Sequence, residues 1–396
     1  MENINKDAQV LAFRLHQHHL ADRLPPGSLV AAAGACGLQN TPPGSAYLSL
    51  HARISGLTPA EVDANLESDK ELLQMWSLRA APHLFPTCDL DVFTLGLLPD
   101  DEASLRAFIP GASQALDRIG ISATEILRFT SEATLRALDN QEFTKDELGI
   151  LLARQLEEKL TASQLAQWRL PSWYAAGQFL GESLVRFILS IVALQRIICL
   201  APRRSGAAAL IRTDQWLKRA LPETDRNQAR AELLRRYLGC FGPSTPAQFA
   251  AWTGISLAQA TQNWRLVEKE LTLVNFKGQE TWIHTTDLTS LMTPPKPIGI
   301  RFLPPHDPYL QLRDRETLIP EKALQRQLWR SLGNPGVVLV NGRAAAMWRP
   351  RKSGARLELG IQFFTSSTLQ DRAKIEAEAL TLAPFRGCSS VVVKFS

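Results

Sequence analysis

The fold is indicated most clearly by residues 243–284, PSTPAQFAAWTGISLAQATQNWRLVEKELTLVNFKGQETWIH. Apolar residues there follow a helical period and then an alternating one, and Gly254 divides the helical part. Helices are predicted over residues 229–238, 247–253 and 256–271, and a hairpin over 273–283. Lys277 stands at the tip of that hairpin. Two helices joined by a turn and followed by a hairpin are the order of a winged helix, which we predict for residues 222–292.

Two earlier stretches have a related order of helices and strands. In residues 1–123, Thr58 opens a capping box, and residues 72–85 are interpreted as a strand pair that would form a wing. In residues 124–221, a helical part is followed by a basic turn at 202–206 and a short returning strand. We therefore predict three tandem winged-helix units.

Beyond the Pro-rich linker at 293–297 the pattern changes to strands. The predicted strands cover residues 336–340, 344–348, 357–363 and 391–395, with one helix at 370–383. Asn341-Gly342 between the first two strands is a strong signal for a two-residue hairpin. The predicted fold class is mainly α with β: three winged-helix units and a β-rich, barrel-like domain over residues 298–396.

Composition excludes several classes of protein. The chain of 396 residues has 44 Lys and Arg against 39 Asp and Glu, so its charge of +5 only permits a polyanionic partner. Its five cysteines are far apart and form no C-x-x-C pair, which argues against a disulfide framework and a thiolate zinc site. The apolar stretch 184–200 is interrupted by Arg186, which favours a buried helix over a membrane span. We expect a cytoplasmic, nucleoid-associated monomer.

A histidine cluster near the beginning of the chain was weighed as a metal site. On a helix His16 and His19 share a face, but His18 points away and no carboxylate has a matching spacing. The sequence therefore predicts no metal and no cofactor.

Three stretches carry a resemblance to a known family. They are residues 37–46 (GLQNTPPGSA) with 50–53 (LHAR), residues 76–86 (WSLRAAPHLFP), and residues 303–315 (LPPHDPYLQLRDR) with 335–342 (PGVVLVNG). In this order they resemble the family of winged-helix DNA-binding proteins that includes the DNA glycosylases AlkZ and YcaQ. The resemblance implies tandem winged helices with a small β-domain, removal of alkylated or bulky purines from duplex DNA, and no cofactor.

The family's catalytic motif, Gln-x-Gln or Gln-x-Asp, falls on Gln39-Asn40-Thr41. Gln39 matches its first position, whereas Thr41 departs from the second. An N7-alkylated purine is already cationic, so a glutamine that only orients water is sufficient for its release, and Thr41 would assist. Without the family, the same residues are a polar loop in which Thr41 or Ser45 caps the following helix.

Basic and polar side chains in the predicted wings and turns are candidates for contact with DNA. They are Arg79, His83, Arg203, Arg204, Lys277, Arg313, Arg349, Arg351 and Lys352. A further cluster, Arg226, Arg230, Arg235 and Arg236, is either a phosphate-binding face or a solvated one.

Two functions from different classes follow, and a third is less favoured. The first is a monofunctional DNA glycosylase for alkylated or bulky purines, which Gln39 favours. The second is a non-catalytic binder of duplex DNA or a regulator, which Thr41 favours. The mild charge leaves a protein-interaction scaffold as the third.

Overall fold

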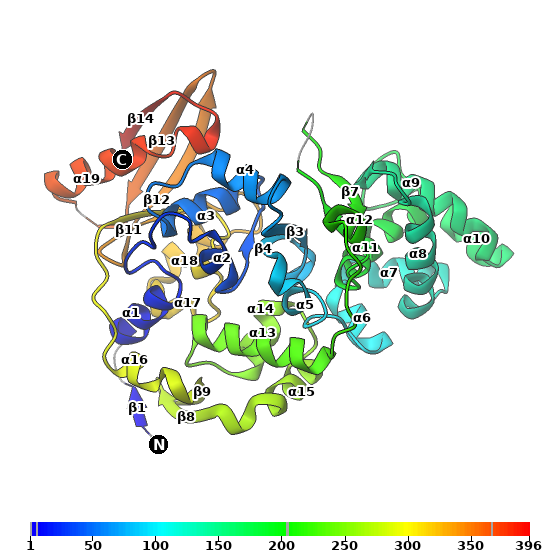
Figure 1. Cartoon of the computed structure of the whole chain (residues 1–396), viewed down its shortest axis with the longest axis horizontal. Coiled ribbons are helices and arrows are strands. Elements are labelled where there is room, and N and C mark those ends of the chain that lie inside the picture. Colours follow the sequence, from blue (N-terminus) through cyan, green and yellow to red (C-terminus); the bar gives the residue numbers. More distant parts are fainter. Residues whose placement is uncertain (1, 5–6, 203–205, 366) are drawn as a thin grey trace. The chain divides into compact units, whose positions relative to one another are not determined.

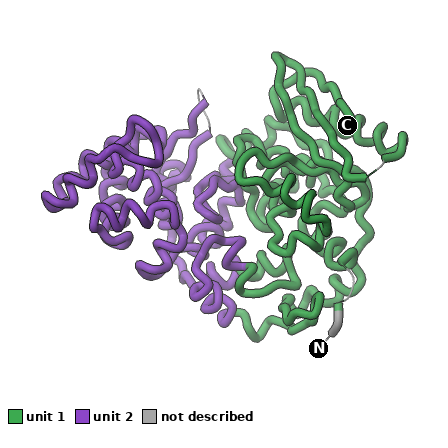
Figure 2. Tube along the Cα trace, turned by 180° about the vertical axis from the view of Figure 1, so that it is seen from behind, with its two compact units in different colours: residues 1–68, 234–248, 267–396 green, residues 69–233, 249–266 purple. Residues whose placement is uncertain are grey.

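The computed structural model describes residues 2–4, 7–202, 206–365 and 367–396. The chain forms two compact units (Figure 2). The first unit contains residues 1–68, 234–248 and 267–396, and the second contains 69–233 and 249–266. The division of the chain into three winged-helix units stays a prediction.

The first unit combines short helices with two sheets (Figure 1). Its elements are β1 (Glu2–Ile4), α1 (Asp7–Gln17), α2 (Leu29–Gly34), β2 (Leu38–Gln39), α3 (Ser45–Arg53), α4 (Pro59–Glu67), β8 (Leu271–Phe276), β9 (Gln279–His284), α16 (Leu288–Met292), β10 (Ile300–Leu303), α17 (Arg315–Leu318), α18 (Lys322–Leu328), β11 (Gly336–Val340), β12 (Arg343–Ser353), β13 (Arg356–Phe363), α19 (Leu369–Leu380) and β14 (Ser390–Phe395). Three helices contain residues of both units: α13 (Arg226–Phe241), α14 (Pro246–Thr253) and α15 (Leu257–Val267).

The C-terminal part of the first unit is a five-stranded sheet in the order β10-β11-β12-β13-β14. The predicted hairpin at Asn341-Gly342 is confirmed, because both residues have positive φ and join antiparallel β11 and β12. Phe302 and Trp348 of the sheet share a core with Leu48 of α3 and Ile375 of α19. In the described residues β10 and β14 are the two ends of this sheet, so the predicted barrel-like closure is not confirmed.

The hairpin of β8 and β9 is also as predicted, with Lys277 and Gly278 between the strands. Strand β1 pairs with β8 in parallel and extends the hairpin to three strands. Val274 and Ile283 point inward because alternate residues of a strand face one side, and they pack on Val10 and Phe13 of α1. This core joins the beginning of the chain to residues about 270 positions later.

The second unit is mostly helical. Its elements are β3 (Leu72–Trp76), β4 (Pro82–Pro86), α5 (Leu90–Phe93), α6 (Glu102–Phe108), α7 (Ser113–Ile119), α8 (Ala123–Ala137), β5 (Phe143–Thr144), α9 (Lys145–Leu156), α10 (Ala162–Trp168), α11 (Leu180–Leu194), β6 (Ile198–Leu200), β7 (Ala209–Arg212) and α12 (Thr213–Leu217). The predicted strand pair is confirmed, because β3 and β4 are antiparallel. The cations of the basic turn, Arg203 and Arg204, lie outside the described residues.

Most of the apolar stretch 184–200 lies in α11, a buried helix as predicted, and its last residues form β6. Its Arg186 is buried to 9% exposure and pairs with Asp146 at 2.9 Å between Nε and Oδ1. A buried guanidinium needs such a partner. None of the described helices has the length and apolar character needed to cross a membrane.

Candidate active-site segment and basic surface

The segment that carries Gln39 and Thr41 runs from α2 to α3 in the first unit. Leu38 and Gln39 form the short strand β2, and both are buried, with Gln39 8% exposed. Thr41 and the two prolines after it are exposed. The segment therefore contains a buried glutamine, Gln39, two positions before an exposed threonine, Thr41.

Asn40, between these two residues, caps the helix that follows. Its side-chain Oδ1 accepts hydrogen bonds from the backbone N–H groups of Gly44 at 2.8 Å and Ala46 at 3.3 Å. The N-cap itself is Gly44, in the left-handed region with φ 86°, and it has no side chain to cap α3. The prediction that Thr41 or Ser45 caps this helix is therefore wrong. The capping side chain belongs to Asn40, four positions before the N-cap residue.

The last residue of α3, Arg53, forms a buried ion pair with Asp307. Arg53 Nη1 and Nη2 donate to the two carboxylate oxygens at 2.8 and 2.9 Å, and Nη1 also donates to the Ser49 carbonyl at 2.8 Å. The two side chains are 1% and 0% exposed. This pair joins the first and third motif stretches, 254 positions apart in the chain. Neither residue had been assigned a role from the sequence, because nothing local shows such a pairing.

Two predicted DNA contacts, Lys277 and Arg313, lie near residues 314–317. Lys277 donates to Thr317 Oγ1 at 3.0 Å and pairs with Asp7 at 3.0 Å. Thr317 in turn donates to Asp314 Oδ2 at 3.1 Å, next to Arg313. Burial lowers the pKa of the half-buried Arg313 guanidinium. Lys277 is thus held by contacts within the protein, and Arg313 is half-buried.

The other two candidates that the structure describes in a wing, Arg79 and His83, belong to the second unit. Arg79 lies in the turn between β3 and β4 with φ 54°, and its Nη1 donates to the Trp252 carbonyl. His83 is 2% exposed, and its Nδ1 lies 2.9 Å from the Ala81 carbonyl. The Arg79 side chain already donates to a backbone carbonyl, and the His83 ring is buried, so neither presents a fully accessible group to a phosphate.

The remaining candidates, Arg349, Arg351 and Lys352, are exposed on β12. Arg349 Nη1 donates to the Gly333 carbonyl at 2.8 Å. Lys352 Nζ donates to the carbonyls of Arg386 and Gly387, each at 3.1 Å. These contacts are to neutral carbonyls, so the positive charges are not neutralised. The β12–β13 hairpin is therefore the most open basic feature among the candidates.

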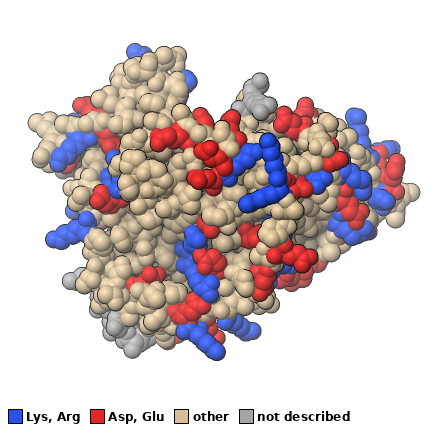
Figure 3. Space-filling model, viewed as in Figure 1, with Lys and Arg blue, Asp and Glu red and all other residues tan. Residues whose placement is uncertain are grey.

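The arginine cluster of α13 is occupied by internal partners. Arg226 and Arg230 both pair with Asp100, at 2.9 and 2.6 Å. Arg235 forms two hydrogen bonds with Glu270, and these bonds hold the pKa of that carboxylate at about 2. On the face drawn in Figure 3, acidic side chains likewise lie among the basic ones within each unit. Arg226, Arg230 and Arg235 thus form ion pairs within the protein, which neither the phosphate-binding nor the solvated interpretation had included.

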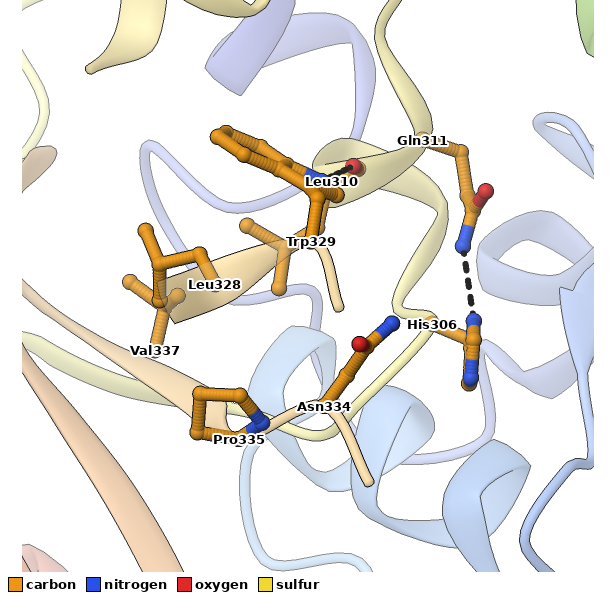
Figure 4. Close-up of a pocket in the computed structure, with 8 residues that line it drawn as sticks. All are labelled: His306, Leu310, Gln311, Leu328, Trp329, Asn334, Pro335 and Val337. Atoms are coloured by element: carbon orange, nitrogen blue, oxygen red, sulfur yellow. Dashed lines mark hydrogen bonds between the residues drawn. The ribbon is translucent and has the colours of Figure 1, made fainter. Parts of the chain in front are cut away.

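The third motif stretch also lines a small pocket of the first unit (Figure 4). Its walls are mostly apolar, with Trp329 and Leu310 on one side and His306 on the other. The Trp329 indole donates to the Leu310 carbonyl at 2.9 Å, and His306 Nδ1 lies 3.3 Å from Gln311 Nε2. Trp329 and His306 thus have partners in the walls, whereas Asn334 Oδ1, which also lines the pocket, has none among the described residues.

Comparison with known proteins shows the family to which the chain belongs. A family model described as DNA glycosylase AlkZ-like matches residues 32–385, so the chain belongs to the AlkZ-like DNA glycosylase family. It is 25% identical over 402 residues to an interstrand DNA cross-link repair glycosylase of Streptomyces sahachiroi, covering 98% of each chain. The solved structure of the Streptomyces sahachiroi DNA glycosylase AlkZ has a TM-score of 0.76 at 21% identity, covering 100% of both chains.

The family membership confirms the predicted class, a DNA glycosylase that binds and repairs DNA. The structural likeness confirms a mixed helix and strand fold. The substrate and the roles of Gln39, Thr41 and the basic residues stay predictions.

Proposed function

We propose that this protein is a monofunctional glycosylase that hydrolyses the N-glycosidic bond of alkylated or bulky purines in duplex DNA. The observation that carries the proposal is the Gln39–Thr41 segment. Asn40 turns its side chain to the N–H groups of α3. Gln39 and Thr41 flank Asn40, with Gln39 buried in β2 and Thr41 exposed two positions later. Family membership supplies the reaction class.

Hydrolysis of the N-glycosidic bond requires the protein to position a water and to provide polar groups near the sugar. Cleavage passes through a sugar with oxocarbenium character, and a water must attack from a defined direction. The Gln39 amide oxygen accepts a hydrogen bond from that water, and the burial of Gln39 restricts its side chain to few rotamers. An N7-alkylated base leaves as a neutral purine, so no general acid is required. Glutamine does not titrate, which suits a site that only orients water.

Thr41 holds the same water from the exposed side in this proposal. Its hydroxyl both donates and accepts a hydrogen bond, but it has no charge and a shorter reach than Asp or Gln. We therefore infer a slower enzyme than one with the full motif, or one for which the substrate supplies part of the electrostatic stabilisation. A cationic or bulky adduct meets that condition. The relative from Streptomyces sahachiroi is named for interstrand cross-link repair, so cross-linked duplexes are included as substrates to test.

Duplex DNA is bound, in this proposal, through the exposed cations of the β12–β13 hairpin, with Lys277, Arg313 and Arg79 as further contacts. Lys352 contributes most, because its contacts are to neutral carbonyls, and the exposed Arg351 on the same strand adds to it. His83 is left out of this set because its ring is buried. The monomeric state and association with the nucleoid stay predictions.

The test is base release from a duplex that contains N7-methylguanine, and from a cross-linked duplex, measured as alkali-labile abasic sites. We expect Gln39→Ala to lower the rate by about 10²–10³-fold while DNA affinity changes little, because the lost contact is made in the transition state. The matched control is Gln9→Ala. Gln9 is a glutamine of the same unit that donates to the Leu291 carbonyl, and its loss should leave the rate within a few-fold.

Restoring the family motif tests Thr41. Thr41→Asp and Thr41→Gln should each raise the rate of base release if the segment keeps its geometry. If the unmodified protein and both variants bind alkylated DNA but release no base, the glycosylase proposal fails. The protein would then be a DNA binder whose family site has lost its chemistry.

A further inference from the structure

Three metal-ligating side chains from distant parts of the chain meet inside the first unit. His18 follows α1, Cys36 lies between α2 and β2, and Cys240 is in the last turn of α13. Their candidate ligand atoms all lie within 4.8 Å of one another. His18 Nδ1 is 3.7 Å from Cys36 Sγ. All three side chains are buried, at 0%, 2% and 3% exposure.

The positions of these side chains are held by independent contacts. Cys240 Sγ lies 3.4 Å from the Ala35 carbonyl, and Arg236 of the same helix donates to the Gly34 carbonyl. The His18 ring packs edge-on against Phe241, with the ring centroids 5.0 Å apart. Helix α13 is therefore fixed against the segment that contains Cys36, and the cluster does not depend on a flexible side chain.

A buried polar atom near the cluster has no partner. The hydroxyl of Tyr309, whose ring packs edge-on against the His18 ring at 5.5 Å, has no hydrogen bond within the part of the chain that is described. The His18 ring interacts with the Cys240 backbone, and its Nδ1 lies 3.7 Å from Cys36 Sγ. Buried polar atoms without partners are rare in folded proteins and point to an absent ion or water.

We propose that His18, Cys36 and Cys240 bind one thiophilic divalent metal ion of the Zn²⁺ class. Ligand bonds of about 2.0–2.3 Å imply distances of about 3.6–3.8 Å between ligand atoms of a tetrahedral site. The observed 3.7 Å already meets this range, and the cluster needs to contract by about 1 Å at most. The fourth position takes a water.

The charges support a metal in this buried place. Binding releases the two thiol protons to solvent as the two sulfur–metal bonds form, so a divalent ion with two thiolates and a neutral imidazole is uncharged overall. The neighbouring Arg53 is neutralised by Asp307. A neutral complex avoids the large cost of placing a net charge in the interior.

The proposed site is connected to the catalytic segment, a consequence that rests on the proposed function. Cys36 precedes Gln39 by three residues. A metal that joins Cys36 to α13 and His18 would hold the beginning of β2 in place. Binding itself does not depend on that function, so failure of the metal site and failure of the glycosylase proposal are distinguishable.

The first experiment titrates Co²⁺ into the full chain after chelator treatment under reducing conditions. We expect one Co²⁺ per chain, with the absorption bands of thiolate coordination, and displacement of these bands by Zn²⁺. Cys36→Ser and Cys240→Ser should each abolish the bands. Cys88→Ser is the control and should keep them, because Cys88 is an exposed cysteine outside the cluster. Absence of thiolate bands in the unmodified chain would overturn the proposal.

A second measurement uses only the unmodified chain, so it does not depend on the folding of variants. Alkylation of each cysteine is followed by peptide mass spectrometry with and without Zn²⁺. At free Zn²⁺ of about ten times Kd the open, metal-free form falls about tenfold, so alkylation of Cys36 and Cys240 should slow by that factor. Cys199, which is buried in the second unit, should not change. Equal slowing of all three cysteines, or of none, would contradict a specific site.

Discussion

The buried Arg53–Asp307 pair offers the sharpest test of how the first unit is held together. In Asp307→Asn the side chain keeps its size but loses its charge. The Arg53 guanidinium, 1% exposed, is then left without a counter-ion, and one of its two carboxylate contacts faces an amide N–H instead. Breaking a buried pair in this way costs about 3–5 kcal/mol. With an m-value of about 3 kcal/mol per M, the urea midpoint of the first unit falls by about 1 M or more.

Urea unfolding of the variant and of two comparison proteins isolates the cause. Glu358→Gln alters surface pairs with Arg356 and Lys394 in the same unit and should cost less than about 1 kcal/mol. The double variant Arg53→Met, Asp307→Leu removes both charges, and it should be clearly more stable than Asp307→Asn. A change below about 1 kcal/mol in Asp307→Asn, or a double variant no more stable than it, would show that an unpaired buried charge is not what destabilises the unit.

Further predictions concern pH, salt and turn geometry. Burial lowers the pKa of His51 to about 4, so folding excludes a proton that the unfolded chain binds below about 6.5. Stability is therefore lost as the pH falls from about 6.5 to 4, by up to about 3 kcal/mol, and thermal unfolding of His51→Asn should show a shallower dependence on pH. DNA affinity should fall steeply with salt, and Arg351→Gln and Lys352→Gln should each reduce the slope by about 1; an unchanged slope in both would remove these residues from the interface. Gly342→Ala should destabilise by about 1–3 kcal/mol or more in urea unfolding, because its Cβ would lie 2.6 Å from Pro297. Gly360→Ala has open space and should be near neutral, so equal losses would refute the steric reasoning.

Local features of the fold were predictable from the order of residues. The hairpins at Lys277-Gly278 and Asn341-Gly342, the strand pair of β3 and β4, and the buried helix α11 all lie close to their predicted positions. Each depends on residues within about a dozen positions of one another, through turn chemistry and the period of apolar side chains. The family's motif on Gln39 was visible for the same reason.

Contacts between distant residues were not predictable in this way. Arg230 was open between a phosphate contact and a solvated face, but it pairs with Asp100, and the His83 ring is buried rather than on a surface. One local prediction also failed: Thr41 suggested a helix cap, but Asn40 makes the capping hydrogen bonds, and Gly44 occupies the N-cap with a left-handed backbone.

The sequence by itself thus determined the elements, their turns, the family and the segment on which catalysis is proposed. Only the tertiary structure decided which charges are buried in pairs and which cysteines meet. His18, Cys36 and Cys240 have no ligand spacing along the chain, and the sequence argued against a thiolate metal site for that reason. Packing of α13 against the segment before β2 places their ligand atoms within 4.8 Å. Such proximity depends on long-range packing, which a pattern of neighbouring residues does not encode.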